Sequence, residues 1–167
     1  MSEPKKDRAF IDACLERTRA GPVALLDVTR GLTDEDVRRK PGAGKLSLLE
    51  HMAHMLDMER DVFGVRLRRV LEEDNPKLDP VDQEHFVDES RYAGRTFQQL
   101  LEEWAELRRA NVSLVESTGQ ADWPRPVRHP DLGKATFADV VHRWSRHDAD
   151  HLRQAEIIAR NCRERLS

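Results

Sequence analysis

The sequence is poor in the residues that build sheets or disulfide frameworks. Aromatic residues make up only 5% of its 167 residues, and it has two cysteines, Cys14 and Cys162. These lie far apart without a CxxC pair, which excludes a disulfide framework and makes them poor candidates for metal ligands. We therefore expect a protein of a reducing compartment, located in the cytoplasm.

An excess of positive charge and long apolar runs are also missing. The 28 Lys and Arg residues are interspersed with 31 Asp and Glu residues, so nucleic acid is not expected as a partner. No run of about 18 apolar residues is present, and we therefore expect no association with a membrane. Neither GxGxxG nor GxxxxGKS/T occurs, which argues against a nucleotide cofactor.

The sequence does contain strong helical periodicity. Its length suits a single domain over residues 1–167, and its 35% of charged residues suits surface helices. Apolar residues recur at helical spacing in four long segments, and none of these segments shows the alternation of a strand. We expect an all-α fold, an antiparallel four-helix bundle with long loops.

Capping and breaking residues set the bounds of these helices. Pro22, after Gly21, is expected to break the first helix. Ser47 followed by Glu50 forms a capping box that opens the second helix, and Thr136 opens the last. The four helices are predicted over residues 10–26, 47–71, 97–119 and 136–163.

Two connections between the helices are long. Residues 73–92 contain two prolines and seven acidic residues, and a loop of this length often acts as a lid or a binding segment. Residues 121–134 form the second irregular connection. Each loop carries a histidine, His85 and His129, and we expect neither to act in a functional site.

His147 and His151 stand four residues apart on the last predicted helix. At about 100° per residue they share the apolar stripe with Trp144, whereas His142 falls on the opposite side and is expected in solvent. Asp148 points roughly 100° away from His147 and is expected to make surface ion pairs. The pair of histidines is therefore predicted to face the interior.

Two buried imidazoles one turn apart need polar partners. They are either satisfied core histidines or ligands that aim one nitrogen each at a shared cation, about 2.0–2.1 Å away. The spacing by itself is a weak signal, and a third ligand from another helix would strengthen it. Either His51 or His54 on the second helix offers that ligand.

The second helix has two apolar stripes on nearly opposite faces. Met55 and Met58 lie on the same stripe as His51 and His54, and Met52 lies on the other stripe. One stripe should pack inside the bundle, while the other lines a cavity or a subunit interface. On this basis we predict a homodimer.

The segments LSLLEHMAHMLDME and HPDLGKATFADVVHRWSRHDADHLRQ resemble the DinB-like superfamily, the YfiT-type metal-binding four-helix bundles, over nearly the whole chain. The resemblance implies a divalent metal ion, such as zinc, nickel or iron(II), held by His54, His147 and His151. It implies that His51 is not a ligand. Many relatives have Trp-Ser where this chain has Leu46 and Ser47, a difference at the mouth of the cavity.

The resemblance also suggests an activity without identifying it. Similar families include thiol S-transferases, a maleylpyruvate isomerase and proteins labelled metal-dependent hydrolases. We expect a metal-dependent thiol S-transferase that acts on a small-molecule thiol. The alternatives are a metal-dependent hydrolase and a non-catalytic metal-binding bundle of the stress response.

Two residues lie one helical turn from the expected ligands. Glu50 precedes His54, and Gln154 follows His151. Each is a candidate catalytic residue, either a hydrogen-bond acceptor behind a ligand or a proton shuttle. Alternatively, Glu50 only caps its helix and Gln154 is a polar residue at the margin of the bundle.

Overall fold

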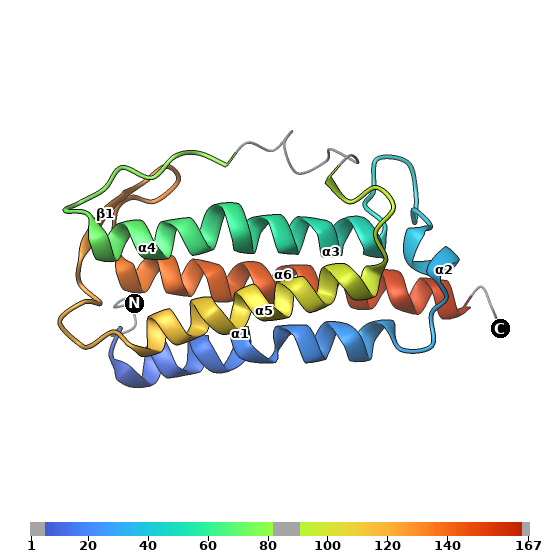
Figure 1. Cartoon of the computed structure of the whole chain (residues 1–167), viewed down its shortest axis with the longest axis horizontal. Helices are drawn as coiled ribbons and strands as arrows, with labels where there is room; N and C mark the ends of the chain where they lie inside the picture. The colour runs from blue at the N-terminus through green and yellow to red at the C-terminus, as the bar shows by residue number, and fades with distance from the viewer. Residues whose placement is uncertain (1–5, 82–90, 165–167) are drawn as a thin grey trace, which may run out of the picture.

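The computed structural model describes residues 6–81 and 91–164, and they form a four-helix bundle (Figure 1). The second long helix of the bundle consists of three consecutive segments, an α-helix, a six-residue π-helix and another α-helix. The expected all-α bundle with long loops is confirmed. Its elements are α1 (Arg8–Thr29), α2 (Asp34–Arg38), α3 (Leu48–Asp57), the π-helix η1 (Met58–Phe63), α4 (Gly64–Glu72), α5 (Phe97–Glu116), β1 (Pro126–His129), β2 (Gly133–Thr136) and α6 (Phe137–Glu164).

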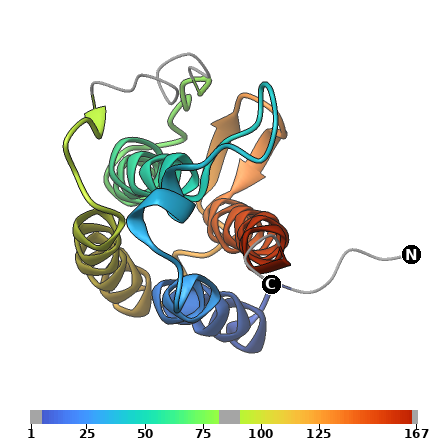
Figure 2. The ribbon, with the colours of Figure 1, turned by 90° about the vertical axis from the view of Figure 1, so that its right-hand side faces the viewer.

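Neighbouring helices run parallel in two cases and antiparallel in the other two (Figures 1 and 2). α1 and α6 run the same way, so Ile11 clusters with Phe137 at one end and Leu25 with Ile158 at the other. The second long helix and α5 both run the opposite way, since α4 ends at one end of the bundle and α5 begins at the other. α6 is thus antiparallel to the second long helix, and this pair carries the histidines.

The first helix is continuous, so the break predicted at Pro22 is wrong. Proline has no N–H to donate to the carbonyl four residues earlier, which is that of Thr18. Arg108 of α5 donates its Nη1 hydrogen to this carbonyl at 2.6 Å. A side chain from another helix therefore satisfies the group that Pro22 leaves open, and α1 continues to Thr29.

The capping residues act as the sequence indicates. The Ser47 hydroxyl accepts from the Glu50 backbone N–H at 3.1 Å, and a Glu50 carboxylate oxygen accepts from the Ser47 N–H at 2.7 Å. Thr136 and Asp139 make the equivalent pair of bonds at the start of α6. Local side-chain chemistry thus sets where the two histidine-bearing helices begin.

The connection before α6 contains two short strands that the sequence pattern does not predict. β1 and β2 pair antiparallel, with Pro126 opposite Thr136 and His129 opposite Gly133. The hairpin also bonds to the segment after α4, since the Arg128 N–H donates to the Pro76 carbonyl at 2.9 Å. Strands of four residues are too short to show a periodic pattern, and the contact that holds the hairpin against residues 76–78 comes from a segment distant in sequence.

Both apolar stripes of the second long helix are buried within the same chain. Met52, Met55 and Met58 are all buried, whereas Val65, further along the stripe that contains Met55 and Met58, is exposed. Within residues 6–81 and 91–164, no helix combines the length and the apolar character that a membrane span requires.

Candidate metal centre

Three histidines from two antiparallel helices meet inside the bundle. His54 of α3, His147 and His151 of α6 each offer a ring nitrogen, and these nitrogens lie within 4.8 Å of one another. The ring centroids of His54 and His151 are 4.5 Å apart, and those of His147 and His151 are 4.4 Å apart. The structure therefore brings together the three residues for which the sequence predicts a shared ligand role.

The spacing of the nitrogens suits one cation. Ligand nitrogens at about 2.0–2.1 Å from a zinc ion in tetrahedral geometry lie roughly 3.3–3.4 Å apart. The Nε2 atoms of His54 and His147 face each other at 3.2 Å. A small movement of either side chain is enough to accommodate an ion between them.

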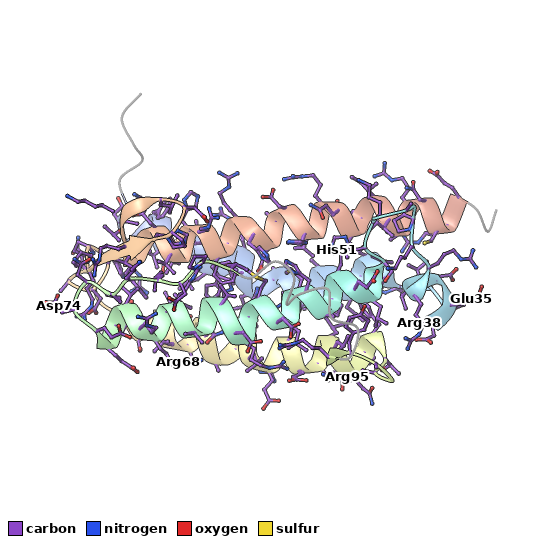
Figure 3. The ribbon with its side chains drawn as sticks, turned by 90° about the horizontal axis from the view of Figure 1, so that it is seen from above. Glu35, Arg38, His51, Arg68, Asp74 and Arg95 are labelled. Carbon is purple, nitrogen blue, oxygen red and sulfur yellow. The ribbon has the colours of Figure 1, made fainter. Side chains whose placement is uncertain are left out.

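His51 is not part of this cluster, but it contacts His151 through a ring nitrogen. Its Nδ1 lies 3.2 Å from the Nδ1 of His151, and Figure 3 shows His51 between α3 and α6. Because the Nδ1 of His151 is used in this contact, its Nε2 remains for a metal. Of the two candidates on the second helix, His54 is the one that joins the cluster, and His51 orients His151.

Burial favours the neutral form of His54, His151 and His51, and the neutral form is the one that binds a metal. Desolvation, followed by repulsion from His147 and His51, lowers the pKa of His54 from 6.5 to about 3. Desolvation and the neighbouring histidines lower the pKa of His151 to about 2. The same burial lowers the pKa of His51.

A buried ionic cluster lies next to the histidines on the core side. The Arg108 guanidinium bonds to Glu59 at 2.8 Å and to Asp148, and it is sandwiched between the rings of Trp104 and Trp144. The prediction of surface ion pairs for Asp148 is wrong, since this residue is only 2% exposed. Helical periodicity predicts that the Asp148 side chain points about 100° away from that of His147. It does not predict that α5 packs on this side of α6 and brings Arg108 to Asp148.

The ionic cluster carries a net negative charge beneath the metal centre. One guanidinium faces two carboxylates, and a carboxylate oxygen of Asp148 lies 3.9 Å from the Nδ1 of His147. A negative charge at this position stabilises a dication held by the histidines. Neither Arg108 nor Glu59 stands out in the sequence, because isolated charged residues on amphipathic helices are normally exposed.

A pocket of about 580 Å³ opens in front of the histidines. Met58 and Phe63 form part of its apolar wall, and the Phe63 ring lies 5.2 Å from that of His147. His142 also lines the pocket and contacts Phe10, so it is only partly in solvent. A volume of this size suits a small-molecule ligand.

The other predicted site residues lie apart from this pocket. Glu50 is engaged in its capping box and accepts from Lys40 at 2.9 Å, and Gln154 is exposed on α6. Neither lines the pocket, so a catalytic role for either residue stays a prediction. His129 is buried in the β1–β2 hairpin, and His85 lies outside the described residues.

Comparison with known proteins agrees with this architecture. Residues 15–155 match the family model described as the DinB superfamily. A solved structure titled YfiT from Bacillus subtilis, "a probable metal-dependent hydrolase with an unusual four-helix bundle topology", superposes with a TM-score of 0.82. The two chains are 18% identical, and the match covers 96% of this chain and 91% of the YfiT chain. The search of curated proteins found no match.

Proposed function

The chain belongs to the DinB superfamily, and from this premise we propose that it is a metal-dependent enzyme of the thiol S-transferase type. His54, His147 and His151 would hold a divalent ion such as zinc, nickel or iron(II). The observation that carries the proposal is the convergence of three imidazoles on the wall of a ligand-sized pocket.

Three neutral ligands leave the full double charge of the ion and at least one open coordination position. A metal held in this way supplies positive charge that stabilises a thiolate or a hydroxide at neutral pH. In thiol transfer, a bond forms between sulfur and an electrophilic carbon while the bond from that carbon to its leaving group breaks. The thiol proton passes to solvent, and the leaving group departs with the bonding electrons.

The residues around the centre favour thiol transfer over hydrolysis. Among the described residues, no aspartate or glutamate joins the histidine cluster, and the three aspartates that line the pocket, Asp131, Asp139 and Asp150, are each paired with a basic side chain, which makes them poor proton donors to a leaving group. A thiol bound to a metal ion needs no such group, because coordination itself deprotonates it. Met58 and Phe63 provide an apolar surface against which the electrophile can bind.

The test is an assay of metal-loaded protein with a panel of low-molecular-weight thiols and an aryl halide as electrophile. We expect turnover that depends on thiol concentration and is lost in His147→Ala. His142→Ala is the matched control, because His142 lines the same pocket but stands outside the cluster. The proposal fails if the wild-type protein is no faster than His147→Ala.

Hydrolysis is the second candidate, favoured by the structural similarity to YfiT, which is described as a probable metal-dependent hydrolase. Here the rate of ester cleavage would depend on the metal but not on added thiol. Metal binding without turnover in either assay would instead support a non-catalytic metal-binding bundle.

A further inference from the structure

We propose that Arg66 forms a carboxylate-binding subsite in the pocket beside the histidines. The substrate would then be an elongated anionic molecule, with its metal-binding group at the histidines and a carboxylate at Arg66. This inference rests on the proposed function and adds the chemical class of the ligand. It is carried by the position of Arg66, by its burial and by the partners it has.

Arg66 is a buried cation that forms no direct ion pair with a carboxylate in the described part of the chain, and Asp131 and Asp79 act on it only through space. It is 6% exposed, and its Nη2 donates to the Asp79 carbonyl at 2.7 Å while its Nη1 faces the Nε2 of His129 at 3.2 Å. The equally buried Arg108, in contrast, bonds to two carboxylates. A guanidinium has five N–H donors in a planar fork that fits a carboxylate, and the Asp79 carbonyl accepts from one of them.

His129 is a poor partner for Arg66. Its Nδ1 faces the backbone N–H groups of Asp131 and Leu132, at 3.2 and 3.4 Å, and burial lowers its pKa to about 4. A neutral imidazole has one acceptor nitrogen, so accepting from the hairpin leaves an N–H on Nε2 that points at the Arg66 donor. A bound anion supplies the acceptor that this arrangement lacks.

The π-helix places Arg66 on the same face as His54. In a straight α-helix, their separation of twelve positions corresponds to a rotation of roughly 120°. A π-turn inserts one extra residue, which removes about 100° and leaves the two side chains roughly 20° apart. The same shift brings Phe63 from the opposite face of the helix to its contact with His147.

The acidic residues that line the pocket have other partners. Asp131 pairs with Arg143, Asp139 pairs with Lys6 at 2.6 Å, and Asp150 pairs with Arg153 at 3.2 Å. The pocket wall therefore contains a buried positive charge at Arg66. The metal ion expected at the histidines would add a second, double positive charge. Both attract an anion, and burial strengthens that attraction by excluding water.

The distance between the two subsites sets the shape of the ligand. Twelve residues correspond to roughly 18 Å of helix, which the lean of helical side chains toward the N-terminus shortens on the Arg66 side. A ligand that reaches both subsites must therefore be extended. The apolar side chains of Met58 and Phe63 line the pocket between them and suit an aliphatic or aromatic middle section.

The experiment uses cobalt(II)-loaded protein, whose visible spectrum reports thiolate coordination. Mercaptoalkanoic acids of increasing length are titrated beside mercaptoalcohols of the same length. We expect the acid to bind at least tenfold more tightly than the alcohol at one optimal length, because a fixed distance separates the subsites. Arg66→Gln should abolish this preference, and Arg66→Lys should retain part of it.

Arg146→Gln is the matched control, since Arg146 lines the same pocket but is exposed. Its preference for the acid should stay within about threefold of that of the wild type. Equal binding of acids and alcohols by wild-type protein overturns the inference, whether or not Arg66→Gln folds. A preference that survives Arg66→Gln, or disappears in Arg146→Gln, overturns it as well.

Failure of the proposed function gives a different result. If the histidines do not hold a metal, cobalt fails to bind or binds equally to His147→Ala. In that case any spectral response to a thiol of either series is the same in His147→Ala as in the wild type. A spectrum that responds to thiols without regard to their carboxylate rejects the Arg66 subsite while leaving the metal centre in place.

Discussion

Arg108 is a single buried residue that contacts all of the long helices of this bundle. It bonds to Glu59 and Asp148, satisfies the carbonyl that Pro22 leaves open, and stacks between two tryptophans. The Asn111 amide and the Trp144 indole also donate to Glu59, at 2.8 and 2.9 Å. The cluster thus links all four long helices.

Removing the Arg108 guanidinium should therefore greatly reduce the stability of the protein. We expect Arg108→Met to lower the free energy of unfolding by about 3–5 kcal/mol, because it strands two buried carboxylates. Arg109→Met, a change at the adjacent exposed position, should stay within about 0.5 kcal/mol of the wild type. Urea unfolding followed by circular dichroism measures both, and similar effects for the two variants would contradict this account of Arg108.

The histidines make the metal-free protein sensitive to acid. The pKa values of His54 and His151 are about 3 and about 2 in the folded chain, against 6.5 for an exposed histidine. The unfolded chain therefore binds more protons below pH 6.5, and stability falls as pH decreases from 6.5 toward 3. At pH 5 we expect a loss of about 2 kcal/mol per histidine.

The measurement is urea unfolding of chelator-treated protein between pH 7.5 and 5. The double variant His54→Gln, His151→Gln should show a flatter dependence on pH, because its side chains do not titrate. The assignment is wrong if the double variant loses as much stability as the wild type over this range.

Among the elements, the π-helix η1 most affects the site. The Gly64 N–H donates to the Glu59 carbonyl, five residues earlier, and this bond defines the wider turn. A Cβ atom at Gly64 would lie 2.8 Å from that carbonyl oxygen and 3.0 Å from the Asn111 amide nitrogen. The wider turn thus depends on a residue without a side chain.

Gly64→Ala should consequently destabilise the protein although alanine is the better helix former. The gain in helix propensity is about 1 kcal/mol, and the clash with backbone costs about 1–3 kcal/mol. We expect a net loss of stability together with weaker binding of the mercaptoalkanoic acids, since Arg66 lies just beyond the turn. At Gly42 the nearest atom to an added Cβ is 3.9 Å away, so Gly42→Ala should be close to neutral in thermal unfolding. Equal thermal midpoints for Gly64→Ala and wild type would show that the turn tolerates a side chain.

For the whole molecule, metal binding and folding should be coupled. The three ligands come from two helices that are distant in sequence, so the unfolded chain lacks the centre. Zinc at 100 times its dissociation constant should stabilise the fold by about 2.7 kcal/mol, which raises the thermal midpoint by roughly 5–10 °C. Differential scanning calorimetry with zinc and with chelator checks this, and His147→Ala should show no shift. Equal midpoints for the wild type under both conditions would refute the coupling.

The oligomeric state is also decided at the scale of the whole molecule. The sequence predicted a homodimer because the second helix has a second apolar face. That reason no longer applies, because the chain buries both faces itself. The homodimer stays a prediction, and sedimentation velocity at micromolar concentration distinguishes the two states. A single species of 19 kDa would exclude the homodimer at that concentration.

Local patterns were sufficient to predict the helices and the histidine pair of α6. Ser47 with Glu50 and Thr136 with Asp139 cap their helices as expected, because capping depends on residues three apart. His147 and His151 lie on one stripe at four-residue spacing, whatever the rest of the fold does. The choice of His54 as the third ligand came from the resemblance to the DinB-like superfamily, since periodicity left His51 equally possible.

The tertiary structure decided what depends on other helices or on departures from ideal geometry. Arg108 of α5 donates hydrogen bonds to the carbonyl of Thr18 and to the carboxylate of Asp148. The first contact explains why α1 continues past Pro22, where the sequence predicted a break. The second explains why Asp148 is buried, although the sequence predicted it on the surface. The π-turn rotates Phe63 and Arg66 toward the histidines, which a constant 100° per residue does not anticipate. Sequence periodicity thus describes each helix alone, whereas the pocket and its charges arise only where α3, η1, α4 and α6 pack together.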